Sequence, residues 1–177
     1  MAKEKNKDNE QIINEIIEGF NKVHNNAKAT IRGEWTNAFM QCLVDLGVKH
    51  NKYKVYTSAA NVPKGKGGGE WLFDLCWSIE GDGDKWKENF KGLKLICESE
   101  WNTWEDEIVH DFQKLAVAKA DIKIMLVQYK SNNEFEDIKK WCERSVVEDL
   151  HNDNSEYYLI GSGNDDSKKV KCCRLWN

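Results

Sequence analysis

The chain has no long apolar run, no CxxC pair and no large excess of charge of either sign. Among its 177 residues 32% are charged, and no segment has the length and apolar character of a membrane-spanning helix. The N-terminus, residues 1–7, is charged and lacks the apolar segment of a secretory signal peptide. A cytoplasmic protein that does not interact with membranes is therefore expected.

Cysteine and histidine are present without the spacing of a metal or disulfide framework. The six cysteines include no CxxC pair, and most lie in apolar runs, where a thiol packs as a small apolar side chain. The four histidines are scattered without the spacing of zinc ligands. The net charge of −4, from 26 basic and 30 acidic residues, gives no overall attraction to nucleic acid, so any such contact must be local.

Acidic side chains occur on strand-like sequence in the middle of the chain. The apolar segment 71–77 carries Asp74, and the segment 93–101 carries Glu98 and Glu100. Because side chains alternate along a strand, the two glutamates point the same way, about 7 Å apart. Carboxylates this close repel each other unless they are neutralised, and a divalent cation with oxygen ligands neutralises them. The pattern predicts a divalent-cation site on this acidic face.

Hydrophobic periodicity predicts one α/β domain over residues 1–177, with a central mixed sheet flanked by helices. Gly47 is expected to end the second helix, and Asn102 or Thr103 to cap the helix that follows the acidic strand. The expected elements are a helix at 9–25, a helix at 35–46, strands at 53–59, 71–77 and 93–101, a helix at 104–115, a strand at 122–129, and a C-terminal helix with a β-hairpin over 134–177. The tryptophans expected to face the core are Trp35, Trp71, Trp77, Trp101, Trp104 and Trp141.

The order helix, strand, strand, strand, helix, strand, with an acid on the second strand and Glu-x-Glu on the third, resembles the core of the PD-(D/E)XK nuclease superfamily. The resemblance covers about residues 30–130. In that superfamily a strand Asp and the first acid of a (D/E)-x-K tripeptide hold Mg²⁺, and the Lys positions or activates the attacking water. Asp74 and Glu98 match the two acids, and Glu100 stands in the position of the Lys. In this respect the chain is similar to the BamHI-like restriction endonucleases, which carry Glu there as a proposed base.

The resemblance implies a restriction endonuclease-like fold and Mg²⁺-dependent hydrolysis of DNA phosphodiester bonds. Asp74 and Glu98 would bind the metal, and Glu100 would activate water or bind a second metal. Many superfamily members carry a supporting Glu where Glu34 begins the second helix, although a helix N-terminal acid that interacts with the macrodipole explains it equally well. Lys114 lies on the polar face of the helix after Glu100. It either takes the place of the Lys missing from the tripeptide or is a solvated surface lysine. DNA is the expected partner, and a homodimer is compatible with the resemblance.

Two other interpretations stay open. A nuclease-like fold without catalysis, acting as a nucleic-acid- or protein-binding module, is favoured by the missing Lys, the acidic net charge and the small size. A structural or immunity-type partner of another protein would expose an apolar patch, expected around Cys172, Cys173, Leu175 and Trp176. The glycine-rich segment 61–69 has two interpretations. It is a flexible hairpin loop, or its lysines lie near the metal site and contact phosphates.

Overall fold

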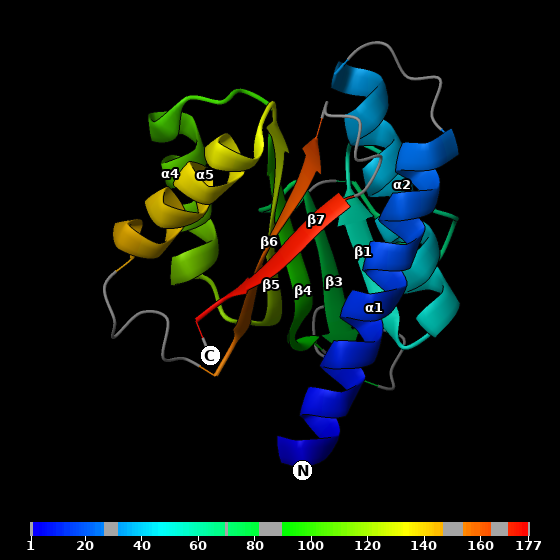
Figure 1. Ribbon diagram of the computed structural model, residues 1–177. Coiled ribbons are helices and arrows are strands. Elements are labelled where there is room, and N and C mark those ends of the chain that lie inside the picture. Colours follow the sequence, from blue (N-terminus) through cyan, green and yellow to red (C-terminus); the bar gives the residue numbers. More distant parts are fainter. Residues whose placement is uncertain are drawn as a thin grey trace.

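The computed structural model describes residues 2–26, 32–69, 71–81, 90–146, 154–163 and 170–176. These residues form an α/β fold in which a seven-stranded mixed sheet lies between two pairs of helices (Figure 1). The predicted α/β class is therefore confirmed. The elements are α1 (Ala2–Asn26), α2 (Arg32–His50), β1 (Tyr53–Thr57), β2 (Gly67–Gly68), β3 (Leu75–Glu80), β4 (Phe90–Glu100), α4 (Glu105–Val117), β5 (Ala120–Tyr129), α5 (Asn132–Ser145), β6 (Glu156–Gly163) and β7 (Val170–Leu175).

The strands lie in the order β2-β1-β3-β4-β5-β6-β7. β3 is antiparallel to both β1 and β4, whereas β4, β5 and β6 are parallel to one another. α4 connects β4 to β5, so these elements form a crossover unit whose two strands end at the same edge of the sheet. The succession α2, β1, β3, β4, α4, β5 is the one that the sequence predicts, with the short β2 inserted after β1.

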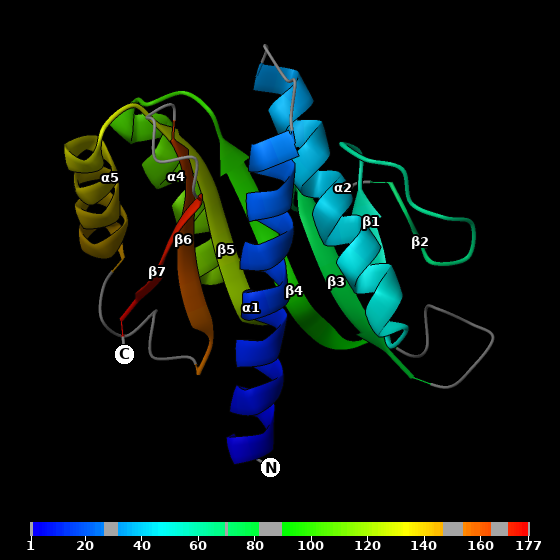
Figure 2. The same cartoon turned by 45° about the vertical axis from the view of Figure 1, so that its right-hand side comes forward.

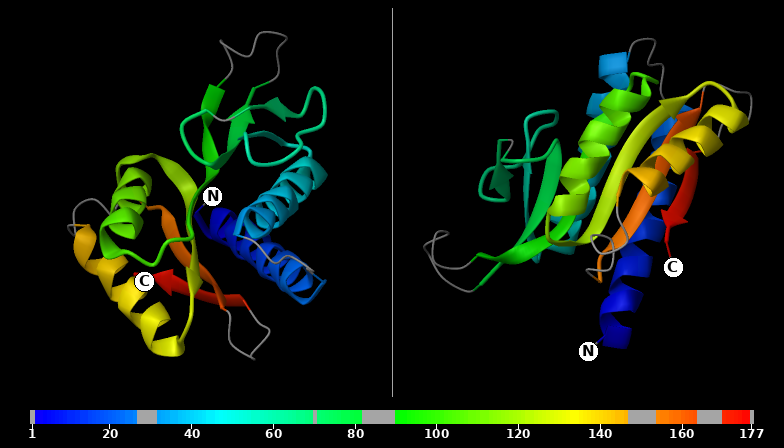
Figure 3. Two further views of the ribbon diagram at one scale, coloured as in Figure 1. Left: turned by 90° about the horizontal axis from the view of Figure 1, so that it is seen from above. Right: turned by 90° about the vertical axis from the view of Figure 1, so that its left-hand side faces the viewer.

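Each face of the sheet is covered by one pair of helices. α1 and α2 lie side by side over one face (Figure 2), and α4 and α5 cover the other, as the view from above shows (Figure 3). Each pair buries its own apolar cluster, because strand side chains alternate between the two faces. On β4, Leu95 and Cys97 belong to the cluster under α1 and α2, whereas Ile96 belongs to the cluster under α4. Glu98 continues the alternation of Ile96 and therefore points toward α4.

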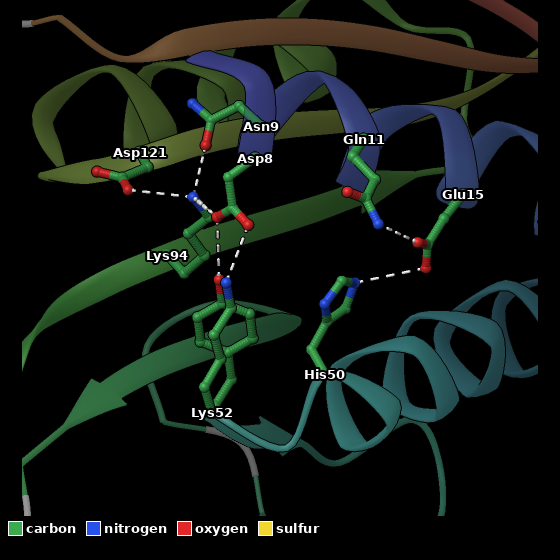
Figure 4. Close-up of polar contacts among 9 residues, drawn as sticks. Asp8, Asn9, Gln11, Glu15, His50, Lys52, Lys94 and Asp121 are labelled. Atoms are coloured by element: carbon green, nitrogen blue, oxygen red, sulfur yellow. Dashed lines mark hydrogen bonds and ion pairs between the residues drawn. The ribbon is translucent and has the colours of Figure 1, made fainter. Parts of the chain in front are cut away.

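A buried network of charged and polar side chains fixes the N-terminal half of α1 to the sheet (Figure 4). The side chain of Lys94 on β4 is only 4% exposed, and its ammonium lies 2.8 Å from Asp8 Oδ2 and 3.4 Å from Asp121 Oδ2. The same ammonium donates a hydrogen bond to Asn9 Oδ1 at 2.6 Å, and Asn9 Nδ2 donates to Glu156 Oε1 at 2.9 Å. α1 is thus connected through one lysine to β4 and through one asparagine to β6.

Gly47 does not end α2, which continues to His50. A Cβ at position 47 would lie 2.6 Å from Val55 Cγ2 and 2.8 Å from the Trp77 ring. The glycine therefore serves the close approach of the helix to the sheet, and the prediction that it terminates the helix is wrong.

Two of the six tryptophans expected in the core are exposed. The exposed fraction is 48% for Trp71 and 73% for Trp104, whereas Trp77 is fully buried. Trp104 occupies the N-cap position of α4, and no side-chain hydrogen bond caps the helix there, so the predicted caps at Asn102 or Thr103 are also wrong. Of the six, Trp35, Trp101 and Trp141 are partly exposed and pack against the buried clusters.

The structure differs from the sequence prediction in two details of the strands. β3 begins at Leu75, so Asp74 immediately precedes the strand instead of lying within it. β2 lies in the segment 61–69 that the sequence predicts as a loop, because its two glycines pair with β1. Lys66, beside this pairing, donates a hydrogen bond to Asn51 Oδ1, and a phosphate contact for the loop lysines stays a prediction.

The C-terminal hairpin is confirmed, because β6 and β7 are antiparallel neighbours. Its apolar residues are not an exposed patch. Leu175 is 1% exposed, and Cys172, Cys173 and Trp176 pack against the two buried clusters. The expectation of an exposed C-terminal patch is therefore wrong. In the described ranges, no helix combines the length and apolar character required to cross a membrane.

Candidate functional site

Asp74 and Glu98 lie at neighbouring backbone positions where β3 begins and β4 approaches its end. The two strands are antiparallel, and Leu75 lies opposite Cys97, so the residues before Leu75 lie beside those after Cys97. Asp74 Oδ2 accepts a hydrogen bond from Ser99 N at 2.8 Å and another from Ser99 Oγ at 2.7 Å. These two bonds fix the Asp74 carboxylate against β4, one residue beyond Glu98.

The carboxylate of Glu98 is buried beneath α4 and is paired with Lys114. Glu98 is only 2% exposed, and Lys114 Nζ lies 3.0 Å from its Oε1. The contact is an ion pair without the alignment of a hydrogen bond, and Oε1 has no aligned hydrogen-bond donor in the described part of the chain. Lys114 Nζ also lies 3.1 Å from Asp111 Oδ1, one turn earlier on the helix. The lysine therefore contacts the site while its side chain stays 41% exposed.

Burial dominates the electrostatics of Glu98. It raises the pKa of the carboxyl from 4.5 to about 7, and Lys114 opposes this shift, whereas the charges of Asp74 and Asp111 add to it. Partial burial lowers the pKa of Lys114, but its contacts with Glu98 and Asp111 outweigh that effect and raise it overall. The pair is thus an ammonium facing a carboxylate that gains or loses its proton near neutral pH.

Glu100 lies at the end of β4 and turns toward the next backbone segment. Its Oε1 accepts a hydrogen bond from Asn102 N at 2.6 Å. Together with α4 it lines a shallow pocket of about 500 Å³ whose lining residues are Glu100, Asp106, Glu107, His110 and Asp111. Because Asp111 also contacts Lys114, this acidic pocket adjoins the Glu98 pair.

Glu34 lies in the first turn of α2, exposed, on the opposite side of the sheet from α4. Stacked rings connect this end of the helix to the end of β4. The Trp35 and Phe39 ring centroids lie 5.7 Å apart, and the Phe39 and Trp101 centroids lie 6.1 Å apart. Glu34 is therefore at the end of the sheet where Glu100 lies, but not on the face that carries Glu98.

The donor atoms of the site are of the kind that Mg²⁺ or Mn²⁺ binds, since Asp74, Glu98 and Glu100 all offer carboxylate oxygens. Two buried carboxylate oxygens, Glu98 Oε1 and Glu107 Oε2, have no hydrogen-bond partner among the described residues. In those same residues, however, no three acidic, histidine or cysteine side chains are grouped closely enough to hold a metal ion. The Asp74 carboxylate is fixed on Ser99, next to Glu98 in the chain, and its charge acts on Glu98. A metal site would require the two carboxylates and a third ligand to turn toward one another.

Ser99 and Asp111 belong to this site and are absent from the sequence prediction. Strand alternation assigns Ser99 to the face opposite Glu98, which gives no reason to connect its hydroxyl with Asp74. The signal for Asp111 is its position three residues before Lys114, a spacing at which side chains on a helix are neighbours.

The site is defined by the residues of this chain alone. Comparison with models of protein families, with curated proteins and with solved structures finds no match to the chain.

Proposed function

We propose that this chain is a metal-dependent nuclease that hydrolyses DNA phosphodiester bonds and has a restriction endonuclease-like core. The observation that carries the proposal is that two acids and a lysine lie at one junction of the fold, where Asp74 is bonded to the residue next to Glu98 and Glu98 is paired with Lys114. Asp74 and Glu98 lie at the adjoining ends of two antiparallel strands. Lys114, on the following helix α4, lies 3.0 Å from Glu98. The PD-(D/E)XK superfamily, which the sequence resembles, uses two acids and a lysine for this reaction.

The arrangement of the elements supports the same proposal. α2, β1, β3, β4, α4 and β5 follow the α-β-β-β-α-β order of that superfamily's core, and the four strands are consecutive neighbours in the sheet. The acids lie at the β3–β4 junction, and α4 follows directly after the second acidic strand. Fold alone does not fix an activity, so the proposal depends on the side chains at this junction.

Each side chain has a role in the proposed reaction. Asp74 and Glu98 would hold Mg²⁺ or Mn²⁺, and Glu100 would complete the ligand set or accept a proton from the attacking water. A bound divalent cation supplies positive charge for the scissile phosphate and lowers the pKa of a bound water. Lys114 provides an ammonium on the same side of the sheet, which suits an anionic phosphate oxygen. Glu34, exposed on the other face of the sheet, is assigned no direct contact with the metal or the phosphate.

Cleavage of a mixed DNA panel tests the proposal. Supercoiled, linear and single-stranded DNA are incubated with Mg²⁺ or Mn²⁺ and either the wild type, Glu98→Gln or the control Glu105→Gln. Glu105, at the start of α4, forms a more exposed ion pair with Arg144, and its replacement removes one carboxylate outside the site. The proposal expects cleavage by the wild type and the control only. Equal cleavage by Glu98→Gln would assign any nuclease activity to another site or to a contaminant.

A nuclease-like fold that binds nucleic acid or protein without catalysis is the second candidate. One observation favours it specifically: Lys114 already balances the charge of Glu98, and no three ligands are grouped for a metal in the described residues. In that case the acids and the lysine stabilise the β4–α4 junction. Absence of Mn²⁺ binding and of cleavage in a folded wild-type protein would support this candidate.

A further inference from the structure

We infer that three aromatic side chains at the β1–β3 end of the sheet bind single-stranded nucleic acid, with bases stacked on the rings and phosphates paired with neighbouring lysines. The three side chains, called the aromatic row, are Tyr56, Trp71 and Phe90. The inference goes beyond the proposed function, because this binding needs neither a metal nor cleavage.

The aromatic row lies beyond the helices that cover its face of the sheet. Tyr56 lies opposite Cys76 of β3, and both belong to the face that carries the cluster under α4. α4 packs on β4 and β5, and the view from above shows β1, β2 and β3 extending away from α4 and α5 (Figure 3). Trp71 and Phe90 are 48% and 49% exposed, although both are large aromatic side chains. The row is thus accessible to a ligand.

The rings of the row contact one another without stacking face to face. The Tyr56 and Trp71 centroids lie 6.3 Å apart with their planes at 51°, and the Trp71 and Phe90 centroids lie 5.4 Å apart with their planes at 77°. In an edge-to-face pair, one ring keeps both of its faces free of the other ring. Proteins that bind single strands stack successive bases on such aromatic side chains. The row therefore has the geometry of a stacking surface.

Positive charge is concentrated beside the row. The segment 51–69, which contains β1 and β2, has four lysines and no acidic residue, whereas the whole chain has a net charge of −4. One of the four, Lys52, is paired with an acid of α1. Lys54 shares a face of β1 with the tyrosine of the row, and Lys64 is exposed in the following loop. On β4, Lys91 is exposed next to the row. These lysines favour an anionic ligand.

The carboxylate of Glu80 also lies at the row, but it is engaged within the protein. Its Oε1 accepts a hydrogen bond from Tyr56 OH at 3.0 Å and another from Ser78 Oγ at 3.2 Å. These bonds hold the tyrosine in place. Exposed rings bordered by lysines suit a ligand that carries both aromatic faces and closely spaced negative charges. Single-stranded nucleic acid has both, whereas a duplex hides its base faces within the stack.

Fluorescence anisotropy of labelled oligonucleotides tests the inference on the full chain. The buffer contains a chelator, so metal-dependent cleavage does not occur. The probes are oligothymidylate, oligouridylate, an abasic oligomer and a duplex of the same length. We expect the two single strands that carry bases to bind at least about tenfold more tightly than the abasic oligomer and the duplex, because one stacked base contributes about that factor. The tighter of the two identifies DNA or RNA as the natural ligand.

Substitutions separate stacking from charge. Trp71→Ala should weaken the binding of single strands about 10- to 100-fold, and Trp71→Phe, which keeps a ring, should lose less. Trp104→Ala is the matched control, because it removes a tryptophan that is 73% exposed and lies outside the row, and it should bind like the wild type. Lys64→Gln should reduce the slope of log affinity against log salt concentration by about 0.7, the share of one phosphate contact.

Three results would overturn the inference. Equal affinity for the abasic and the base-containing single strands would show that charge alone binds the probe. Wild-type affinity in both Trp71→Ala and Phe90→Ala, with each variant folded by circular dichroism, would exclude the row. Lack of binding at low ionic strength, together with a dimer in sedimentation that Trp71→Ala dissociates, would assign the row to a contact between two copies of the chain. None of these results bears on Mn²⁺-dependent cleavage, so the proposed nuclease is tested separately.

Discussion

Asp74 supports the backbone of β4 as well as offering a carboxylate. Its Oδ2 accepts bonds from both Ser99 N and Ser99 Oγ, so removal of the side chain leaves a partly buried N–H without its acceptor. We expect Asp74→Ala to lower the free energy of unfolding by about 1 to 3 kcal/mol. Asp74→Asn retains an acceptor oxygen and should lose less. Urea unfolding of the two variants measures the difference, and equal losses would show that the oxygen retained by Asn does not replace the Asp74 acceptor.

Glu98 makes the stability of the protein depend on pH around neutrality. Burial raises its pKa in the folded state from 4.5 to about 7, so the folded protein holds this proton more tightly than the unfolded chain. The resulting stabilisation is fully present below pH 4.5 and is lost as the pH rises through about 7. The size of the loss is on the order of 3 kcal/mol.

Glu98→Gln removes this titration. Without metal, the stability of the variant relative to the wild type should therefore rise between pH 4.5 and pH 8, by up to the same order of magnitude. Lys114 keeps Asp111 as a partner, so the variant loses little of the lysine's pairing. Urea unfolding across this pH range, in the presence of a chelator, is the measurement. A constant difference between variant and wild type would mean that Glu98 does not titrate in this range.

At the level of elements, α1 is attached to the sheet through the buried charge of one lysine. Lys94 on β4 contacts Asp8 and Asn9 of α1, and its side chain is 4% exposed. Lys94→Met leaves the buried Asn9 carbonyl without this donor and removes one cation from Asp8, which is 35% exposed and keeps Lys52 as a partner, so we expect a loss of about 1 to 3 kcal/mol in the free energy of unfolding. Hydrogen exchange should accelerate first in α1.

Lys49→Met is the matched control for this change. Lys49 also forms an ion pair with an acid of α1, Glu15 at 3.0 Å, but its side chain is 66% exposed. Its loss should change the free energy of unfolding by less than about 1 kcal/mol. Similar losses for the two methionine variants would contradict the special role of the buried lysine.

For the whole molecule, the sequence predicts what depends on local patterns. Apolar periodicity is sufficient for the succession of helices and strands, and alternation along β4 correctly places Glu98 on the face opposite Leu95 and Cys97. The proximity of Asp74 and Glu98 follows once the two strands are neighbours. These features need only the spacing of residues along the chain.

Features that depend on distances between remote elements could not be predicted. In the sequence Gly47 has the usual pattern of a helix end. In the structure it lacks a side chain at the point where α2 comes close to Trp77, and this allows the close approach. The burial of Lys94 depends on where α1, far away in the sequence, crosses β4. Likewise, the face of α4 that carries Lys114 is visible in the sequence, but its contact with Glu98 depends on how the helix returns along the strand.

The most direct test of the proposed nuclease compares Asp74→Asn with Ser99→Ala in Mn²⁺-dependent cleavage of supercoiled DNA. Both variants alter the same hydrogen-bonded pair, but only the first removes the negative charge of the proposed ligand. Ser99→Ala should cleave at a rate close to the wild type. Asp74→Asn should be slower by on the order of 1,000-fold, since a divalent cation contributes several kcal/mol of transition-state stabilisation. Cleavage by Asp74→Asn at the wild-type rate, with both variants folded, would contradict the assignment of this site.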